Sequence, residues 1–350
     1  MLAACKEKMA YRVKVDLDNL PEQTLYVVFE SADLKIVDTL AYDGRSACVI
    51  NQAVEGFRTL TLYYNNQTQW ITVYLEPYVK MTVTGDARYP QLAEIKGGEI
   101  NEMLSLFRKG VAPLLKEQAD LMRNNFGKEQ MADNSTSRLA NISHELHIQA
   151  EAFIRKYPDR KVSAILIGEY FSDPENPLFT DELLAVLDEQ LDDFYVVKEI
   201  KTFSRKAKRT IVGAQAPDFS VRDIYGKTYD ATSFNNSYCI LAFVSMWEDM
   251  CHTKDLFLDE LIEVFSENSV NVVLICLDEN PEAIRKAMAK DTVHWNVVTD
   301  SAGQAIEMID TYNVSSIPMC YLIGRTGNIV LKTDNGIELK QKLDELIPVK

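Results

Sequence analysis

Two apolar runs in the last third of this 350-residue chain constrain its fold more than any other feature. Tyr238–Val244 and Val270–Leu277 consist almost entirely of large and β-branched apolar residues. Strands that are covered on both faces have this composition, whereas strands with one face in water alternate apolar and polar residues. Segments with helical periodicity lie between and after the two runs, at 251–265, 281–289, 302–312 and 337–346. The sequence therefore predicts an α/β domain over 211–350, with helices on both faces of a central sheet.

Before residue 211, the spacing of the apolar residues changes from strand-like alternation to helical periodicity. From Tyr11 to about Asp86, alternating runs and turn signals such as Asp43-Gly44 predict six or seven strands of a small antiparallel β domain, which we place at 11–97. Beyond it the apolar residues recur at helical spacing, which predicts a helical connector over 98–210. The helices of this connector are expected near 136–157, 161–171 and 180–191. Basic residues gather at 201–209, and we interpret them as a solvated helix end.

The charge balance excludes several classes of function. The chain carries 52 acidic and 37 basic side chains, which gives a formal net charge of -15. Such a surface repels phosphate backbones and anionic membranes, so nucleic acid is not an expected partner. The longest apolar run, Tyr238–Val244, has seven residues, whereas a membrane-spanning helix needs ~18 or more. No transmembrane segment is predicted.

The first ten residues are interpreted as a lipobox and its polar tether. Leu2-Ala3-Ala4-Cys5 has the form of a bacterial lipobox, whose cysteine becomes lipidated and N-terminal after cleavage. We expect the native precursor to carry an apolar signal segment ahead of Leu2, since a signal core needs about 7 to 15 residues. The alternative is a chance tetrapeptide. We predict a cell-envelope protein, facing the periplasm or the surface, that contacts the membrane only through a lipid anchor at Cys5.

Four motifs occur in order within 211–350. Gly213–Phe219 matches the opening G-x-x-A-P-D-F, and Asp223–Lys227 matches a D-x-x-G-K hairpin. Leu241–Trp247 occupies a strand usually written F-W-A-S-W, and Tyr312–Pro318 with Tyr321–Ile329 matches Y-x-V-x-x-x-P followed by F-L-I-D-x-x-G-x-I. In these motifs the region resembles the thioredoxin-like domains of TlpA/ResA-type thiol-disulfide oxidoreductases, grouped with the AhpC/TSA family. The resemblance extends more faintly upstream, because a β domain and a helical linker commonly precede such domains in envelope lipoproteins.

The resemblance implies a redox site after the strand 238–244, and two of its chemical groups are replaced. The family uses a C-x-x-C pair at the start of a helix, where the first cysteine attacks and the second resolves the mixed disulfide. The aligned segment runs from Trp247 to Cys251 and has Glu248 at the first cysteine position. The buried acid that often assists proton transfer in the family aligns with Ala242. The site is therefore predicted to be degenerate.

Two functions from different classes follow from this site. Pro318 matches the family's cis-proline, and Ile317 before it would offer its backbone to an extended substrate. The first interpretation is a redox-impaired binding module that holds a protein or peptide in the groove near Pro318. The alternative is an enzyme that uses Cys251 alone, as a thiol oxidoreductase or a peroxidase-like antioxidant enzyme. Negative charge at Glu248 and Asp249 disfavours the thiolate form of Cys251, which argues against the enzyme. The sequence does not exclude it, so both functions stay open.

Neither the residues around Cys251 nor the other cysteines indicate a bound metal or cofactor. Glu248, Cys251 and His252 share the spacing of one helical face, but three ligands without an identified fourth are weak evidence for a metal. Cys239, Cys276 and Cys320 lie in predicted core strands and are interpreted as small apolar fillers. We expect neither a metal nor another cofactor.

Overall fold

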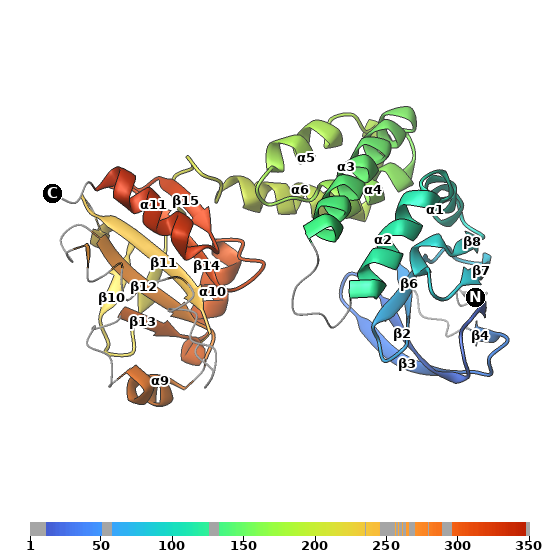
Figure 1. The fold of residues 1–350 in the computed structure, drawn as a ribbon, viewed down its shortest axis with the longest axis horizontal. Helices are drawn as coiled ribbons and strands as arrows, with labels where there is room; N and C mark the ends of the chain where they lie inside the picture. Colours follow the sequence, from blue (N-terminus) through green and yellow to red (C-terminus); the bar gives the residue numbers. More distant parts are fainter. Residues whose placement is uncertain are drawn as a thin grey trace, which may run out of the picture. The chain divides into compact units, whose positions relative to one another are not determined.

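The computed structural model describes residues 12–50, 58–125, 133–234, 236–245, 270–278, 280–288 and 296–347, together with residues 256, 258, 261, 264 and 265. The chain forms two compact units. The N-terminal unit comprises Met1–Phe171 and Leu183–Val197, and the C-terminal unit comprises Ser172–Glu182 and Lys198–Lys350. Each unit has a hydrophobic core of its own, and Figure 1 labels many of the elements that surround the two cores.

The N-terminal unit begins with two four-stranded sheets, ordered β4-β1-β7-β8 and β3-β2-β5-β6. Every second residue of β1 (Arg12–Asp18) is buried, as expected for a strand with one face in water. Buried residues of both sheets, among them Val15 and Leu60, belong to one core, so the sheets pack face to face. The remaining strands are β2 (Gln23–Glu30), β3 (Lys35–Tyr42), β4 (Ala47–Ile50), β5 (Thr59–Tyr64), β6 (Gln69–Tyr74), β7 (Lys80–Asp86) and β8 (Glu94–Lys96).

One pairing in this sandwich departs from the antiparallel pattern expected from the sequence. Strands β1 and β7 run parallel, with Val15 opposite Val83. Parallel neighbours need a long connection between them, and here the chain forms β2 to β6 before it returns to β7. The small β domain is therefore present, and its described strands are antiparallel in every pair except this one.

Helices follow the sandwich in the N-terminal unit. A short 3-10 helix, η1 (Pro90–Leu92), precedes β8, and α1 begins after Gly97 and Gly98, whose φ angles of 93° and 91° suit glycine. The helices are α1 (Glu99–Gly110), α2 (Ala112–Asn125), α3 (Asp133–Lys156), α4 (Lys161–Phe171) and the 3-10 helix η2 (Glu189–Leu191). Within the described part of the chain, no helix is both long and apolar enough to span a membrane.

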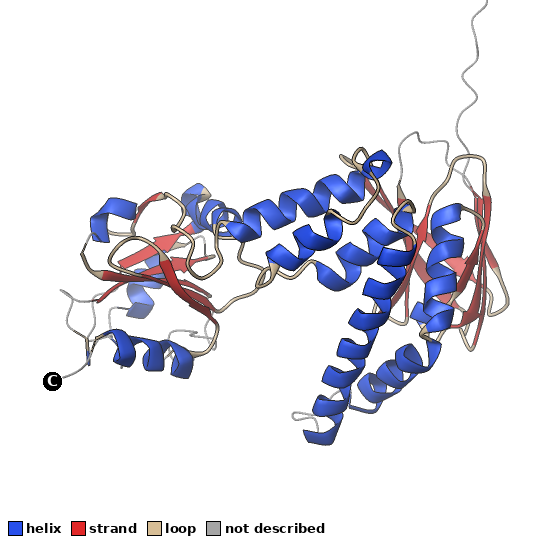
Figure 2. Ribbon diagram, turned by 90° about the horizontal axis from the view of Figure 1, so that it is seen from above, coloured by secondary structure: helices blue, strands red, loops and turns tan. Residues whose placement is uncertain are grey.

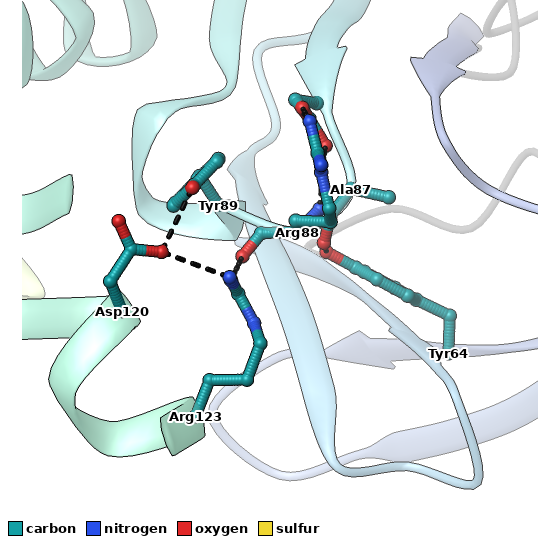
Figure 3. Close-up of polar contacts among 7 residues, drawn as sticks. Tyr64, Ala87, Arg88, Tyr89, Asp120 and Arg123 are labelled. Atoms are coloured by element: carbon teal, nitrogen blue, oxygen red, sulfur yellow. Dashed lines mark hydrogen bonds and ion pairs between the residues drawn. The ribbon is translucent and has the colours of Figure 1, made fainter.

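A polar cluster ties α2 to the sandwich (Figure 3). The hydroxyl of Tyr89 donates a hydrogen bond to the carboxylate of Asp120 at 2.9 Å. The guanidinium of Arg123 donates to the same carboxylate at 2.9 Å and to the backbone carbonyl of Arg88 at 2.6 Å. Since Tyr89 and Arg88 follow β7 directly, these bonds hold the helix against the loop that leaves the sheet.

The C-terminal unit begins with parts of two helices, α5 (Pro177–Leu184) and α6 (Tyr195–Lys208). Of the basic residues predicted at a helix end, Arg205, Lys206 and Lys208 lie in the last turn of α6. Two of these lysines are engaged in ion pairs, Lys208 with Asp181 of α5 and Lys206 with Asp310. These pairs fix the end of α6 within the C-terminal unit.

The centre of the C-terminal unit is a five-stranded sheet ordered β13-β12-β11-β14-β15. Strands β11 (Tyr238–Val244), β12 (Val270–Cys276) and β13 (Asn296–Thr299) run parallel, and β14 (Met319–Ile323) and β15 (Ile329–Thr333) complete the sheet antiparallel. Every residue of β11 is buried, as its continuous apolar run predicts. A hairpin of β9 (Ser220–Arg222) and β10 (Thr228–Asp230) precedes the sheet.

Helices cover both faces of this sheet (Figure 2). Ile284 of α9 (Pro281–Met288) and Leu339 of α11 (Gly336–Leu346) pack in one core cluster, whereas Ala305 of α10 (Gln304–Thr311) packs in the other. Two short 3-10 helices, η3 (Ala231–Phe234) and η4 (Asp300–Ala302), precede β11 and α10. The α/β architecture predicted for 211–350 is confirmed.

Candidate functional site

The candidate site lies at the end of two central strands of the sheet, where β11 ends and β14 begins. The two strands are antiparallel, so Phe243 near the end of β11 faces Met319 at the start of β14. The bond between Ile317 and Pro318, directly before β14, is cis. The structure therefore places these two predicted site residues beside the end of β11. The other predicted site residues, Cys5, Trp247, Glu248 and Cys251, lie outside the described residues.

Two buried tyrosines hold the segment that leads to Pro318. The hydroxyl of Tyr312 donates to the carbonyl of Pro217 at 2.9 Å, and the hydroxyl of Tyr321 donates to the carbonyl of Tyr312 at 2.6 Å. Burial raises the pKa of both hydroxyls, so both stay protonated and act as donors throughout the neutral range. These bonds fix the loop between α10 and β14 to the core of the domain.

Ile317 combines a packed side chain with an available backbone. Its side chain is half-buried and contacts the core cluster on the α10 face of the sheet. Its backbone forms no hydrogen bond to any other residue that the structure describes. An extended peptide beside Pro318 could therefore bond to the backbone N–H and C=O of Ile317, since no described residue bonds to them.

The opposite face of β11, which carries α9 and α11, is closed and apolar at Ala242. Ala242 is 0% exposed and lies between two cross-strand neighbours, Leu274 of β12 and Cys320 of β14. The core cluster on this face consists of apolar side chains and two cysteines. The position where the family resemblance implies a buried acid is thus occupied by a methyl group in a packed interior.

No other buried carboxyl replaces that acid within the described part of the chain. Asp223 is the single acidic residue there that is buried, at 7% exposure. Its carboxylate accepts hydrogen bonds from the backbone N–H groups of Tyr225 and Lys227, so it serves the turn between β9 and β10. It therefore stabilises the D-x-x-G-K hairpin and takes the role of a turn residue.

A thiol–carboxylate contact near the end of β11 was not foreseen from the sequence. The thiol of Cys276, the last residue of β12, donates to the carboxylate of Asp278 at 2.8 Å. Cys276 lies opposite Val244, so this contact is next to the end of β11. The sequence identified Cys276 as a buried filler, which its exposure of 0% supports, but its polar contact depends on how the chain turns after β12.

Cys239 and Cys320 are poor candidates for nucleophiles. Cys239 and Cys320 are almost completely buried and free, at 1% and 0% exposure. Burial raises the pKa of both thiols far above neutrality, because the thiolate would lose its hydration. Neither thiol can therefore supply the attacking thiolate of a redox reaction in the folded protein.

Comparison with known proteins assigns part of the C-terminal unit to a family. Residues 212–332 match the AhpC/TSA family. They form an AhpC/TSA-family domain. This domain is similar to the thiol-disulfide oxidoreductase ResA of Bacillus cereus, with 28% identity over 145 residues that cover 41% of this chain and 81% of ResA.

Solved structures with similarity to this chain include two from Bacteroides. A thiol-disulfide oxidoreductase from Bacteroides fragilis shares 30% identity over 38% of this chain and 99% of its own length, with a TM-score of 0.34. A thioredoxin-like protein from Bacteroides caccae shares 20% identity over 63% of this chain and 85% of its own length, with a TM-score of 0.43. The AhpC/TSA domain is thus a thioredoxin-like domain of the TlpA/ResA type, which confirms the sequence resemblance.

Proposed function

We propose that this protein is a redox-impaired member of the thiol-disulfide oxidoreductases, whose AhpC/TSA domain binds an extended segment of protein or peptide beside Pro318. The observation that carries this proposal is the pair of replacements at the redox site. The sequence has Glu248 in place of the first cysteine, and Ala242 lies in a sealed apolar core in place of an acid.

The chemistry explains why these replacements disfavour turnover. Disulfide reduction by a C-x-x-C pair proceeds through a mixed disulfide that the second thiol resolves within the same molecule. With Cys251 as the single thiol of the motif, a mixed disulfide with a substrate has no partner in the motif to release it. The described thiols of the sheet, Cys239, Cys276 and Cys320, are all buried. Burial also keeps Cys239 and Cys320 protonated, so these two do not substitute for the missing thiol.

Binding requires less of the site than catalysis does. The backbone of Ile317 has no hydrogen bond to a described residue, and the loop that carries it is fixed by Tyr312 and Tyr321. A fixed loop loses little conformational entropy when a peptide pairs with it. We further propose that the protein acts at the cell envelope through lipidation of Cys5, which intact-mass analysis of the native N-terminus tests directly.

The test combines a redox assay and a binding assay on the full chain. We expect no reduction of insulin in the presence of a chemical reductant above the rate of the reductant alone. We expect a fluorescent, reduced and carboxymethylated polypeptide to bind, and Ile317→Glu to weaken that binding at least about tenfold. A glutamate cannot pack on the core cluster as Ile317 does, so the backbone beside Pro318 would lose its position. Ile306→Glu is the matched control, since Ile306 is 60% exposed on α10 of the same unit.

Two results would contradict the proposal. Insulin turnover that Cys251→Ser abolishes would establish a single-cysteine enzyme, the alternative function inferred from the sequence. Equal binding by the Ile317→Glu and Ile306→Glu variants would show that the surface beside Pro318 does not hold the polypeptide.

A further inference from the structure

The N-terminal unit contains a groove that the proposed function does not use. The groove is an open hollow of about 830 Å³ at the start of α1. Three structural segments surround it, namely the turn after β6, the first half of α1 and the turn between α3 and α4. Its lining residues are Glu76, Gly98, Glu99, Glu102, Met103, Leu106, Tyr157, Asp159 and Arg160.

Helix α1 supplies one wall of this groove through its residue spacing. Ile100, Leu104 and Phe107 are buried and hold the helix to the unit. Met103 and Leu106 each precede a buried residue by one position and so lie on an adjacent side of the helix, where they line the groove. Leu106 is 52% exposed, which leaves an apolar surface open on this wall.

The groove is acidic as well as apolar. Four carboxylates and one guanidinium line it, so its local formal charge is negative. Arg160 pairs with Glu99 at 2.8 Å and with Asp159 at 3.3 Å, and both distances join side-chain nitrogen and oxygen atoms. The carboxylate of Glu102 accepts a hydrogen bond from the backbone N–H of Gly97 at 3.1 Å. One cation is therefore shared between two of the acids.

Glu76 lines the groove from the turn after β6. Its carboxylate lies directly over Gly98, so close that a Cβ atom added to Gly98 would approach the carboxylate oxygen to 2.7 Å. No ion pair joins Glu76 to any cation among the residues that the structure describes. A side chain at position 98 would push this carboxylate aside, and the φ angle of 91° at Gly98 also favours glycine. The carboxylate of Glu76 lines a hollow that has apolar side chains on one wall.

We propose that this groove binds a basic, amphipathic segment of another polypeptide. A lysine or arginine of the segment lies between Glu76 and Glu102, and an adjacent large apolar side chain packs on Met103 and Leu106. The charge complementarity defines the cation. Exposed Leu106 and partly buried Met103 favour a ligand with an apolar side chain, because such a contact removes their apolar surface from water. The site would give the protein a second contact with a client chain, on residues that take no part in the redox fold.

The probe for this proposal is a short fluorescent peptide of repeating lysine, leucine and serine, used with the full chain. Companion peptides carry serine in place of leucine, or glutamate in place of lysine. The groove variant is Glu76→Gln/Glu102→Gln/Asp159→Asn, in which the amide at position 102 keeps an acceptor for Gly97. The matched control is Glu30→Gln/Asp33→Asn/Glu94→Gln, which also removes three negative charges from this unit, but from residues outside the groove.

We expect the groove variant to raise the dissociation constant of the lysine–leucine peptide about tenfold at an ionic strength of about 0.02 M. The control variant should change it less than about twofold, and the difference should shrink at about 0.5 M salt. Leu106→Ser should weaken the lysine–leucine peptide about fivefold and leave the lysine–serine peptide unchanged. Circular dichroism and thermal unfolding would verify that each variant is folded, and the single change Glu76→Gln replaces the triple variant if it is not.

Three outcomes would overturn the proposal. Equal weakening by the groove and control variants would assign the binding to the net charge of the whole protein. Equal affinity for the lysine–leucine and lysine–serine peptides, or displacement by spermine alone, would reduce the groove to a cation site. Tight binding of the glutamate peptide would remove the charge argument.

Discussion

The sealed apolar core at Ala242 leads to a sharp prediction about restoring the missing acid. Ala242→Glu would place a carboxyl on the central strand, between Leu274 and Cys320, at a position of 0% exposure. Ala242→Gln is the matched control, because glutamine has nearly the same shape and does not ionise. Overpacking and burial of a polar group should each cost the glutamine variant about 1–3 kcal/mol in the free energy of unfolding.

The glutamate variant should show an additional loss that depends on pH. Burial raises the pKa of the introduced carboxyl, so the folded protein holds it neutral while the unfolded chain ionises above about pH 4.3. The unfolded state then binds fewer protons than the folded state, and stability falls by about 1.4 kcal/mol per pH unit above that point. Between about pH 4.5 and pH 7 the glutamate variant should therefore lose about 3 kcal/mol that the glutamine variant keeps.

Hydrogen exchange of peptides from β11 and β14, read by mass spectrometry and corrected for intrinsic rates, measures this loss in the full chain. A domain of typical stability, about 5–15 kcal/mol, would exchange these amides far faster in the glutamate variant near neutral pH. If the two variants show the same pH dependence, the introduced carboxyl reaches water or a cation. The core at Ala242 would then be open, and our explanation of the degenerate site would fail.

Three further predictions test other parts of the structure. Cys239 and Cys320 should react with iodoacetamide at least about a thousandfold more slowly in the native protein than in urea, by quantitative peptide mass analysis, and fast labelling of either would contradict their burial. Asp86→Asn should lower the free energy of unfolding by about 1 kcal/mol near pH 7. Hydrogen bonds from Arg88 lower the pKa of Asp86 to about 2, so in urea titrations this difference should persist above about pH 4 and vanish as the pH falls to about 2. Asp120→Ala removes the acceptor shared by Tyr89 and Arg123 and should cost about 1–3 kcal/mol in calorimetry, whereas an unchanged transition would show that α2 is held by other contacts.

Local patterns predicted the elements whose structure depends on local sequence. The apolar run Tyr238–Val244 became β11 without a change of bounds, and the helix expected at 161–171 became α4. The prediction for 180–191 was less accurate, because α5 begins at Pro177 and ends at Leu184. Proline favours the first turn of a helix, where its missing N–H costs nothing, so Pro177 after Asn176 marks the start of α5.

Contacts between distant residues were beyond the reach of the sequence. The parallel register of Val15 and Val83 joins strands that are separated by most of the β domain, and alternation alone does not specify direction. The salt bridge between Lys208 and Asp181, which fixes α6 to α5 in the C-terminal unit, likewise requires the packed helices before it can be recognised. Polarity predicted a solvated helix end because it does not reveal a partner that tertiary structure supplies.

The two replacements at the redox site are energetically consistent with each other. A buried acid at position 242 is costly, since a carboxyl in this apolar face must either stay neutral or lose its hydration. Proton transfer to a resolving thiol compensates for that cost only when the motif contains two thiols. The family resemblance aligns Glu248 with the attacking thiol, and our proposal of a redox-impaired protein rests on that alignment. Without that thiol, an acid at 242 would destabilise the sheet and assist no reaction, whereas the methyl group of Ala242 completes the packing between β12 and β14. A protein that binds a peptide beside Pro318 without catalysing its reduction therefore gains stability from alanine at this position. For that reason we interpret the apolar core as support for the proposed binding module.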